Sequence, residues 1–169
     1  MTYMVEPRSR TDIRASAERW RKKYGCDNKL FVPVVKMLDL LSQNDNINYE
    51  IVDDEELPKQ IHASTNLQDR IILIKQSVYD GACKGIGRDR MTIAHEYGHV
   101  ALHINDHSSL YRSFNDNQVQ VYMNPEWQAK CFAGELLIPH KQTSNMTPEQ
   151  IANECGVSLE AATYQLSHR

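Results

Sequence analysis

The segment HEYGH, residues 95–99, combines the residue types and the spacing best suited to chemistry in this chain. His95 and His99 are four residues apart, so on a helix they lie one turn apart on the same face. Two imidazoles need this geometry to bind one zinc ion. Glu96 projects beside the metal, where it can take a proton from a metal-held water and pass it to a leaving amine. We therefore predict a zinc site for peptide hydrolysis with Glu96 as its general base.

The residues around this segment bear on whether the pattern arose by chance. A chance match would consist of two helical histidines with a solvated glutamate between them and no bound metal. Met91 and Leu102 share the stripe of His95 and His99, so the rings should point into the protein. Gly98 would let a neighbouring element approach closely. This context favours metal binding.

A third ligand is needed, because catalytic zinc sites usually combine three protein ligands with one open position. His103 is not suited to that role, since on a continuous helix it is rotated by about 80° from His95. We interpret His103 either as a supporting or substrate-side group, or as a packed structural histidine. Asp106, His107 and Asp116 follow in a polar stretch and are weaker alternatives for the third ligand.

Glu126 is the preferred third ligand. On a helical projection, Ala129, Ala133 and Leu137 lie within about 60° of Glu126, so this residue heads an apolar, core-facing stripe. A carboxylate that points to a core is costly unless it is paired or bound to a metal. Glu135 points to the opposite side, and we expect it to face water. The alternative for Glu126 is a first-turn glutamate that only favours the helix dipole.

Hydrophobic periodicity and turn residues predict an α+β fold around this site. The expected elements, in chain order, are a helix over 11–24, a helix from about Val32, a strand INYEIV (47–52), a hairpin of QIHAST (60–65) and RIILIK (70–75), a helix from Asp89 to His103, and a helix from Pro125 to Ile138. Gly81, Gly85 and Gly87 should mark a loop before the central helix. Residues 105–124 carry no clear pattern.

The end of the chain predicts two short helices. Thr147, Pro148 and Gln150 form a capping box with a proline at the first helical position. That helix should end at Gly156, and Ser158 should cap the second helix. We therefore expect a catalytic domain over residues 1–140 and a two-helix tail over residues 141–169, with the length of a helix-turn-helix.

Composition and charge restrict the class of protein. The chain has 169 residues, of which 41% are hydrophobic, and a net charge of −3, so its overall charge gives no indication of binding to nucleic acid. Neither a membrane-spanning apolar run nor a secretory signal is present, which leads us to expect a cytoplasmic protein. The four cysteines form no CxxC pair, which favours reduced thiols over a disulfide framework.

The paired motifs resemble those of the ImmA/IrrE family of metallopeptidases. They stand here as HEYGHVALH (95–103) and EWQAKCFAGELLIP (126–139), and the tail IANECGVSLEAATYQL (151–166) is similar to the helices that close that family. The resemblance implies a zincin-like core with Zn²⁺ bound by His95, His99 and Glu126, and with Glu96 as the catalytic acid and base. Two positions depart from the family pattern: Tyr97 replaces a common leucine, and Gln128 replaces a common glutamate.

The resemblance also implies a protein substrate. Members of that family cleave helix-turn-helix transcriptional repressors in mobile-element induction or stress responses, and others are paired with toxin–antitoxin loci. We therefore expect a repressor or an antitoxin-like partner. For the oxyanion of the transition state, Tyr97, His103 and Tyr122 are candidate donors, because they are polar and near the motifs.

Two rival functions follow from the same sequence. The tail has the plan of a DNA-binding helix-turn-helix, but residues 141–169 contain Lys141 and Arg169 against three glutamates, whereas a phosphate-facing module should be basic. A non-catalytic zinc protein, such as a toxin–antitoxin component, is the second rival. The intact Glu96 argues against it, because a purely structural site needs no base.

Overall fold

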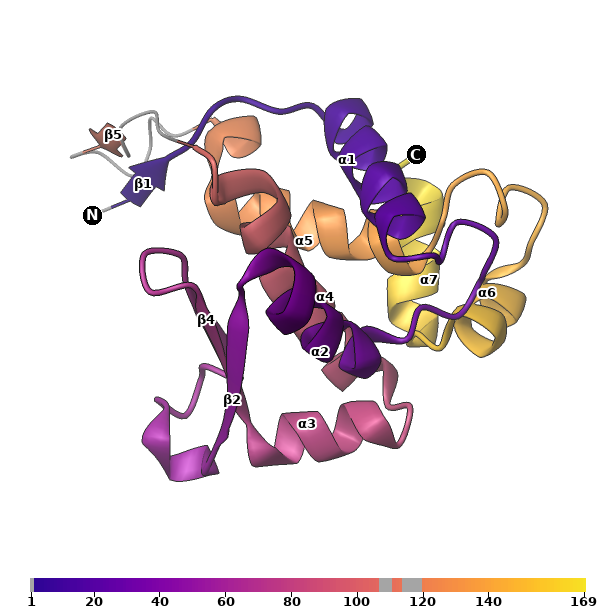
Figure 1. The fold of residues 1–169 in the computed structure, drawn as a ribbon. Helices are drawn as coiled ribbons and strands as arrows, with labels where there is room; N and C mark the ends of the chain where they lie inside the picture. Colours follow the sequence, from indigo (N-terminus) through magenta and orange to yellow (C-terminus); the bar gives the residue numbers. More distant parts are fainter. Residues whose placement is uncertain (1, 107–110, 114–119) are drawn as a thin grey trace.

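A long central helix, α4 (Gly87–His103), runs through the middle of the molecule, and the other elements pack around it (Figure 1). The computed structural model describes residues 2–106, 111–113 and 120–169. The other helices are α1 (Arg10–Lys23), α2 (Val34–Asp45), α3 (Gln76–Cys83), α5 (Pro125–Leu137), α6 (Pro148–Cys155) and α7 (Leu159–Ser167). The strands are β1 (Thr2–Met4), β2 (Asn48–Val52), β3 (Ala63–Asn66), β4 (Ile71–Lys75) and β5 (Tyr111–Ser113), and the short 3-10 helices are η1 (Asp54–Glu56) and η3 (Val121–Met123).

Three of the strands form a mixed sheet in the order β2-β4-β3. Strand β4 is parallel to β2 and antiparallel to β3, so β3 is an edge strand. The turn between β3 and β4 is closed by Asn66, whose side-chain oxygen accepts a hydrogen bond from the backbone N–H of Asp69 at 2.9 Å. The predicted strand and hairpin are therefore confirmed. Strand β3 also packs on α4, and this contact brings the edge of the sheet to the HEYGH segment.

Helix α5 packs directly on α4, and Gly98 makes this contact possible. A Cβ atom on Gly98 would lie 2.8 Å from both Cα and the carbonyl oxygen of Ala129, closer than real Cβ atoms approach. The glycine thus lets the two helix backbones touch, as its position in the motif predicted. This contact fixes the start of α5 beside the two histidines of α4.

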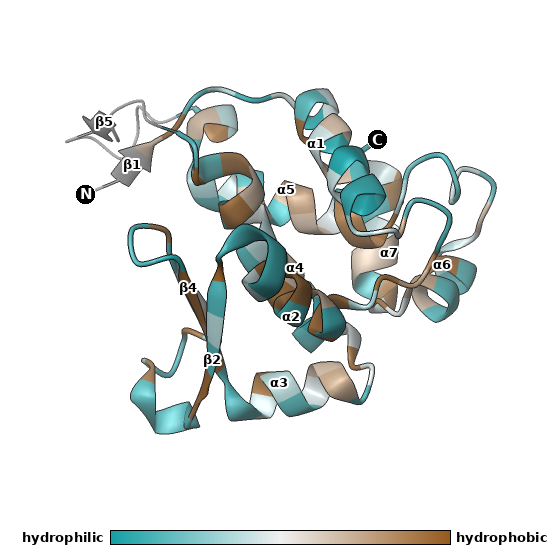
Figure 2. Ribbon diagram, viewed as in Figure 1, coloured by the Kyte–Doolittle hydropathy of each residue, from teal (hydrophilic) through white to brown (hydrophobic). Residues whose placement is uncertain are grey.

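The core lies between α1, α2, α4 and α5. Trp20 of α1 contacts Tyr97 of α4 and Phe132 of α5, with ring centroids 5.8 Å apart in both pairs. Figure 2 shows hydrophobic residues on α4 and β4 in the interior, whereas the outer turns of α1 and α6 are hydrophilic. The aromatic cluster joins three helices that are far apart in the sequence, which is why the geometry of the site depends on the whole core.

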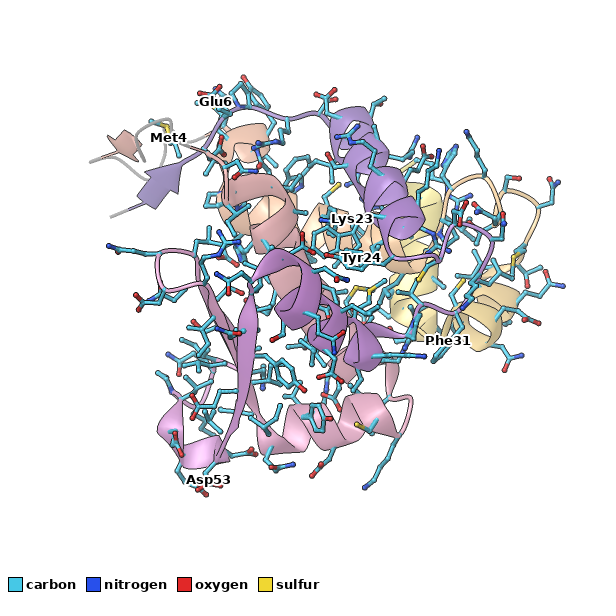
Figure 3. All side chains as sticks on the ribbon, in the orientation of Figure 1. Met4, Glu6, Lys23, Tyr24, Phe31 and Asp53 are labelled. Atoms are coloured by element: carbon cyan, nitrogen blue, oxygen red, sulfur yellow. The ribbon has the colours of Figure 1, made fainter. Side chains whose placement is uncertain are left out.

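The segment between β1 and α1 lies along η3 and the start of α5. The backbone N–H of Val5 donates to the carbonyl of Met123 at 2.9 Å, and that of Arg8 donates to the carbonyl of Tyr122 at 3.1 Å. Glu6, labelled in Figure 3, belongs to this segment. Residues 5–8 are therefore hydrogen-bonded to the segment that directly precedes α5.

The two-helix tail packs on the rest of the chain. Helix α6 begins at the predicted capping box and ends at Gly156, whose φ of 66° is left-handed. The Arg90 guanidinium of α4 donates to the carbonyls of Gly156 at 2.9 Å and Cys155 at 3.2 Å, and it lies 3.8 Å from the centroid of the Phe31 ring. Helix α7 in turn contacts α5. The tail is thus joined to the helices that carry the candidate site.

One helix was not expected from the sequence. Residues 76–83 form α3, although Gly81 was interpreted as part of a loop. A Cβ atom on Gly81 would lie 1.8 Å from a carboxylate oxygen of Asp89, so this glycine allows close packing of α3 on the start of α4. Gly85, with a φ of 82°, does form a turn, as predicted. All four cysteines are free thiols, and none of the described helices is long and apolar enough to cross a membrane.

Candidate metal centre

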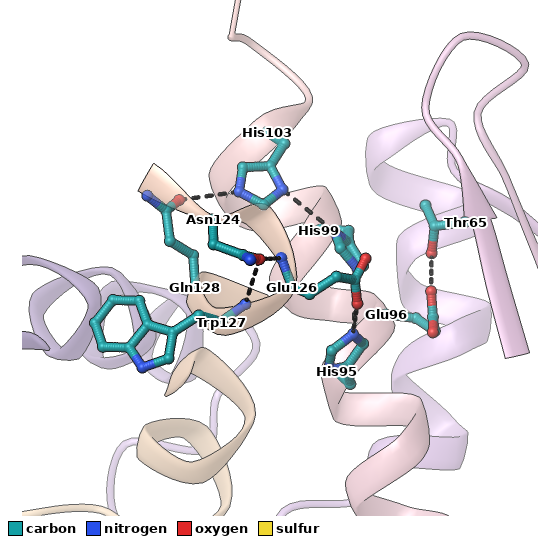
Figure 4. A network of polar contacts seen from close by, with 9 residues as sticks. All are labelled: Thr65, His95, Glu96, His99, His103, Asn124, Glu126, Trp127 and Gln128. Atoms are coloured by element: carbon teal, nitrogen blue, oxygen red, sulfur yellow. Dashed lines mark hydrogen bonds and ion pairs between the residues drawn. The ribbon is translucent and has the colours of Figure 1, made fainter. Parts of the chain in front are cut away.

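His95 and His99 present their Nε2 atoms to one another from consecutive turns of α4. The two Nε2 atoms are 3.2 Å apart, and the rings meet edge to face with centroids 4.9 Å apart. Both rings are half-buried on the side of α4 that faces the start of α5 (Figure 4). The four-residue spacing therefore has the geometric consequence that the sequence predicted.

Glu126 completes the cluster from the first turn of α5. Its two carboxylate oxygens lie 3.0 Å from Nε2 of His95 and 3.2 Å from Nε2 of His99. Asn124 caps the helix by accepting a hydrogen bond from the backbone N–H of Glu126 at 2.8 Å. The two neighbouring imidazoles, His95 first and then His99, hold the pKa of Glu126 well below its usual range. The carboxylate is thus ionised and fixed toward both rings.

The exposure of Glu126 corrects one step of the sequence argument. Its side chain is 70% exposed, so it is not a carboxylate pointing to a core. Ala129, Ala133 and Leu137 are buried as expected, but the stripe reaches the open groove at its first residue. Glu126 does point toward the two histidines, as predicted, but its side chain is not buried, as the prediction had assumed.

The three side chains form a donor set that fits a metal ion. One ligand atom from each of His95, His99 and Glu126 lies within 4.8 Å of the other two. Two imidazole nitrogens and one carboxylate oxygen are ligands that zinc accepts in catalytic sites, where a fourth position stays open. The cluster is therefore compatible with a metal site.

Glu96 lies beside this cluster and outside it. Its side chain is buried, and one carboxylate oxygen accepts a hydrogen bond of 2.5 Å from the hydroxyl of Thr65 (Figure 4). Thr65 belongs to the edge strand β3, so the sheet holds the carboxylate from the side opposite α5. Sequence analysis missed Thr65, because its strand carries no motif and the contact spans 31 residues.

His103 lies one turn beyond His99 and is buried. Its Nδ1 is 3.3 Å from Nδ1 of His99, and its Nε2 is 3.0 Å from the side-chain oxygen of Gln128. Burial lowers the pKa of His103 to about 4, despite the opposing effect of the hydrogen bond to Gln128. His103 therefore supports His99 and does not join the cluster, which agrees with its predicted rotation on the helix.

The weaker alternatives for the third ligand fall elsewhere. Asp106 forms an ion pair of 3.3 Å with Arg8 and lies outside the cluster. His107 and Asp116 lie outside the described residues. Of the two glutamates of α5, Glu126 and Glu135, only Glu126 contacts the histidines.

Glu135 does not face water, which contradicts the prediction. It is only 2% exposed, and its carboxylate binds the Arg14 guanidinium through two hydrogen bonds of 3.1 and 3.3 Å. Gln165 of α7 donates a further hydrogen bond at 3.0 Å. The projection failed because α5 packs on α4, α1 and α7, so it has no single solvent-facing side.

The three candidates for an oxyanion donor have different positions. Tyr97 is fully buried and its hydroxyl donates to the carbonyl of Val34, on the side of α4 away from the cluster, so this candidate is wrong. The nitrogens of His103 already contact His99 and Gln128. Tyr122 lies exposed in η3, before the start of α5.

A groove of about 840 Å³ opens over the cluster. Its walls come from the edge strand β3 and from α4, α5 and α7. The residues nearest the chemistry that line it are Thr65, His95, Glu96, His99, Glu126 and Lys130. An open groove that holds both a metal-binding cluster and a separate carboxylate suits hydrolysis of an extended polymer such as a peptide.

Comparison with known proteins identifies the class. Residues 58–167, well over half of the chain, match the peptidase M78 family, described as the IrrE N-terminal-like domain. The chain therefore belongs to this family of metallopeptidase-like proteins, as its paired motifs indicated. The matched region contains the cluster, Glu96 and the tail as far as Ser167.

The fold is also found among solved structures. A Mycobacterium tuberculosis transcriptional regulator matches with a TM-score of 0.65 and 18% sequence identity, over 94% of this chain and 48% of that chain. The present chain thus spans about half the length of that regulator. No curated protein matches the chain significantly.

Proposed function

We propose that this chain is a zinc-dependent endopeptidase with a zincin-like core, in which His95, His99 and Glu126 bind the metal and Glu96 is the general base. The observation that carries the proposal is the convergence of these three ligand atoms next to a buried carboxylate that is not one of them. A structural zinc site is normally closed by four protein ligands and needs no such base.

Each residue has a distinct role in the proposed reaction. Zinc, when bound, supplies Lewis acidity that activates water and polarises the carbonyl of the scissile bond. Glu96 accepts a proton from the attacking water and then donates it to the nitrogen of the leaving amine. Thr65 donates a hydrogen bond of 2.5 Å to one oxygen of the Glu96 carboxylate, and Glu96 lines the groove. Glu126 balances part of the metal charge.

The groove supports an extended protein substrate. Strand β3 forms one wall, and among the described strands it pairs only with β4, so its other edge has backbone groups that no described strand pairs with. An extended peptide can pair with such an edge by strand addition. The substrate we propose is a helix-turn-helix repressor or an antitoxin-like protein in the cytoplasm, and this part rests on the family resemblance alone.

The test compares wild-type protein with Glu96→Gln. We expect about one zinc ion per chain in both proteins, because Glu96 is not a ligand. A mixed peptide library should be cleaved by the zinc-loaded wild type and left intact by the variant, as read by mass spectrometry of new termini. Where a repressor-like gene lies beside the gene of this chain, its product should be cleaved in the same assay. Equal cleavage by Glu96→Gln would show that the mechanism is wrong.

A DNA-binding regulator remains the alternative, since the solved structure with the same fold is described as a transcriptional regulator. Helix α7, the second helix of the tail, and its capping residue line the groove through Ser158, Glu160 and Ala161. In addition, residues 142–168 contain no lysine or arginine. Neither feature suits contact with phosphates. Duplex DNA binding that weakens as salt rises would favour this alternative, whereas its absence supports the peptidase.

A further inference from the structure

We propose that Gln128 and His103 are positioning residues that fix the tautomer of His99, so that its Nε2 presents a lone pair to the metal. The inference rests on the proposed metal centre and adds a directed chain of hydrogen bonds behind one of its ligands. The chain runs from Gln128 of α5 through His103 to His99 of α4 (Figure 4). Its direction follows from which atoms can only donate and which can only accept.

The amide of Gln128 can take only one orientation. Its nitrogen donates two hydrogen bonds to backbone carbonyls, to Glu6 at 2.8 Å and to Tyr122 at 2.7 Å. Its oxygen lies 3.1 Å from the Arg8 guanidinium, which can only donate. A flipped amide would place its oxygen against two carbonyl oxygens and its hydrogens against a cation. Since Gln128 is fully buried, water cannot relieve that mismatch.

This orientation determines the tautomer of His103. The Gln128 oxygen can only accept, so the His103 Nε2 atom 3.0 Å away carries the hydrogen. A neutral imidazole has a single N–H, and therefore Nδ1 of His103 is an acceptor. The ring of His103 is buried, and its two polar partners, His99 and Gln128, are not carboxylates that would favour a charged imidazolium.

The tautomer of His99 is determined in the same way by its contact with His103. Nδ1 of His103 accepts, so Nδ1 of His99, which lies 3.3 Å away, donates. The lone pair of His99 is then on Nε2, the atom that lies 3.2 Å from both Nε2 of His95 and an oxygen of Glu126. The chain thus places the lone pair of His99 at the cluster before a metal arrives.

A histidine that binds a metal depends on such support for its orientation and basicity. For His99 the supporting partner is another imidazole, that of His103. The direction of the hydrogen bond between them depends on the orientation of the Gln128 amide, which the carbonyls of Glu6 in segment 5–8 and Tyr122 in η3 determine. Gln128 can fill this role because an amide both accepts from His103 and donates to the carbonyls. A glutamate at this position could do only the first.

The first test measures zinc affinity of His103→Phe by competition with a chelating dye. Phenylalanine keeps the ring volume but removes the acceptor for His99, and we expect zinc affinity to fall about 10–100-fold. The matched control is His168→Phe, a change of an exposed histidine at the end of α7. Unchanged zinc affinity in a folded His103→Phe protein would overturn the proposal.

The second test separates the hydrogen-bond direction from packing. Gln128→Glu keeps the acceptor for His103, whereas Gln128→Leu removes it, and both remove the donors to Glu6 and Tyr122. We expect both variants to lose stability, but only Gln128→Leu should lose zinc affinity, by about tenfold. Equal loss of zinc affinity in the two variants would show that Gln128 acts through packing alone and would overturn the proposal.

The third test needs no variant and no substrate. In the zinc-loaded wild-type protein with 15N-labelled histidine, NMR should show hydrogens on Nδ1 of His99 and on Nε2 of His103. This pattern in a chain without cleavage activity would reject the proposed reaction and support the present inference. An active enzyme with the hydrogen of His103 on Nδ1 would overturn this inference and leave the proposed function in place.

Discussion

The residue nearest the proposed chemistry, Glu96, is held by a single hydroxyl from another element. Thr65→Val keeps the β-branched shape of the side chain in β3 and removes its hydrogen bond to the carboxylate. A hydrogen bond to a charged group contributes about 1.5–3 kcal/mol. We expect kcat to fall about 10–100-fold, with KM and zinc content unchanged, because Glu96 loses its orientation toward the attacking water.

Thr65→Ser provides the control for this prediction, since serine keeps the hydroxyl. Steady-state kinetics on a peptide identified in the library digest would measure both variants. A kcat for Thr65→Val equal to that of the wild type would mean that burial alone orients Glu96.

Among the individual site residues, the sequence predicted those that lie a few positions apart on one helix. It did not predict Thr65, which only the folded chain brings to the site. His95, Glu96 and His99 follow from positions on one helix, and Glu126 was placed by its direction on the next. Thr65 was not predictable, because its partner lies 31 residues away and a threonine in a strand is ordinary.

At the scale of elements, the site depends on how closely α5 approaches α4. Gly98→Ala would place a Cβ atom 2.8 Å from the backbone of Ala129, three residues after Glu126. Because a backbone cannot move aside as a side chain can, α5 should shift away from α4. We expect a loss of about 1–3 kcal/mol in the free energy of unfolding, as for other overpacked cores.

The same variant should also bind zinc more weakly, since the shift separates Glu126 from the two histidines. Thermal unfolding and dye competition would measure the two effects in one sample. Wild-type zinc affinity together with reduced stability would show that the start of α5 is held by η3 and segment 5–8, independently of the contact at Gly98.

Most elements were predictable because their local signals agree with their tertiary surroundings. The capping box at Thr147, the turn at Asn66 and the periodicity of α4 each describe a structure that packing then retains. Helix α3 was the exception. Its glycine serves a contact with Asp89 of α4, and a sequence does not distinguish a glycine needed for close packing from one needed for a turn.

At the scale of the whole molecule, three helices meet at Glu135, which joins Arg14 of α1 and Gln165 of α7 to α5. This network explains why a helical projection of α5 alone failed: it assumes one buried side, but α5 is enclosed by other helices on several sides. The charge of Glu135 is therefore paired in the interior, whereas that of Glu126 lies in the open groove.

The two glutamates of α5 should consequently respond in opposite ways to the same substitution. Glu135→Ala leaves the largely buried Arg14 guanidinium and the buried Gln165 amide without their partner, and breaking such a pair costs about 3 kcal/mol or more in the free energy of unfolding. Zinc affinity should be unchanged, since Glu135 lies outside the cluster. Glu126→Ala should leave the stability of the metal-free protein within about 0.5 kcal/mol of the wild type, as for an exposed position.

Glu126→Ala should instead weaken zinc binding by more than the about 10–100-fold expected for the loss of a supporting hydrogen bond, because a ligand is removed. Chemical denaturation of the metal-free proteins and dye competition with zinc would give both quantities for both variants. Each variant serves as the control for the other, since the chemical change and the helix are the same. If Glu126→Ala bound zinc like the wild type, the metal would be held without α5, and the close packing of α5 on α4 would serve the core alone.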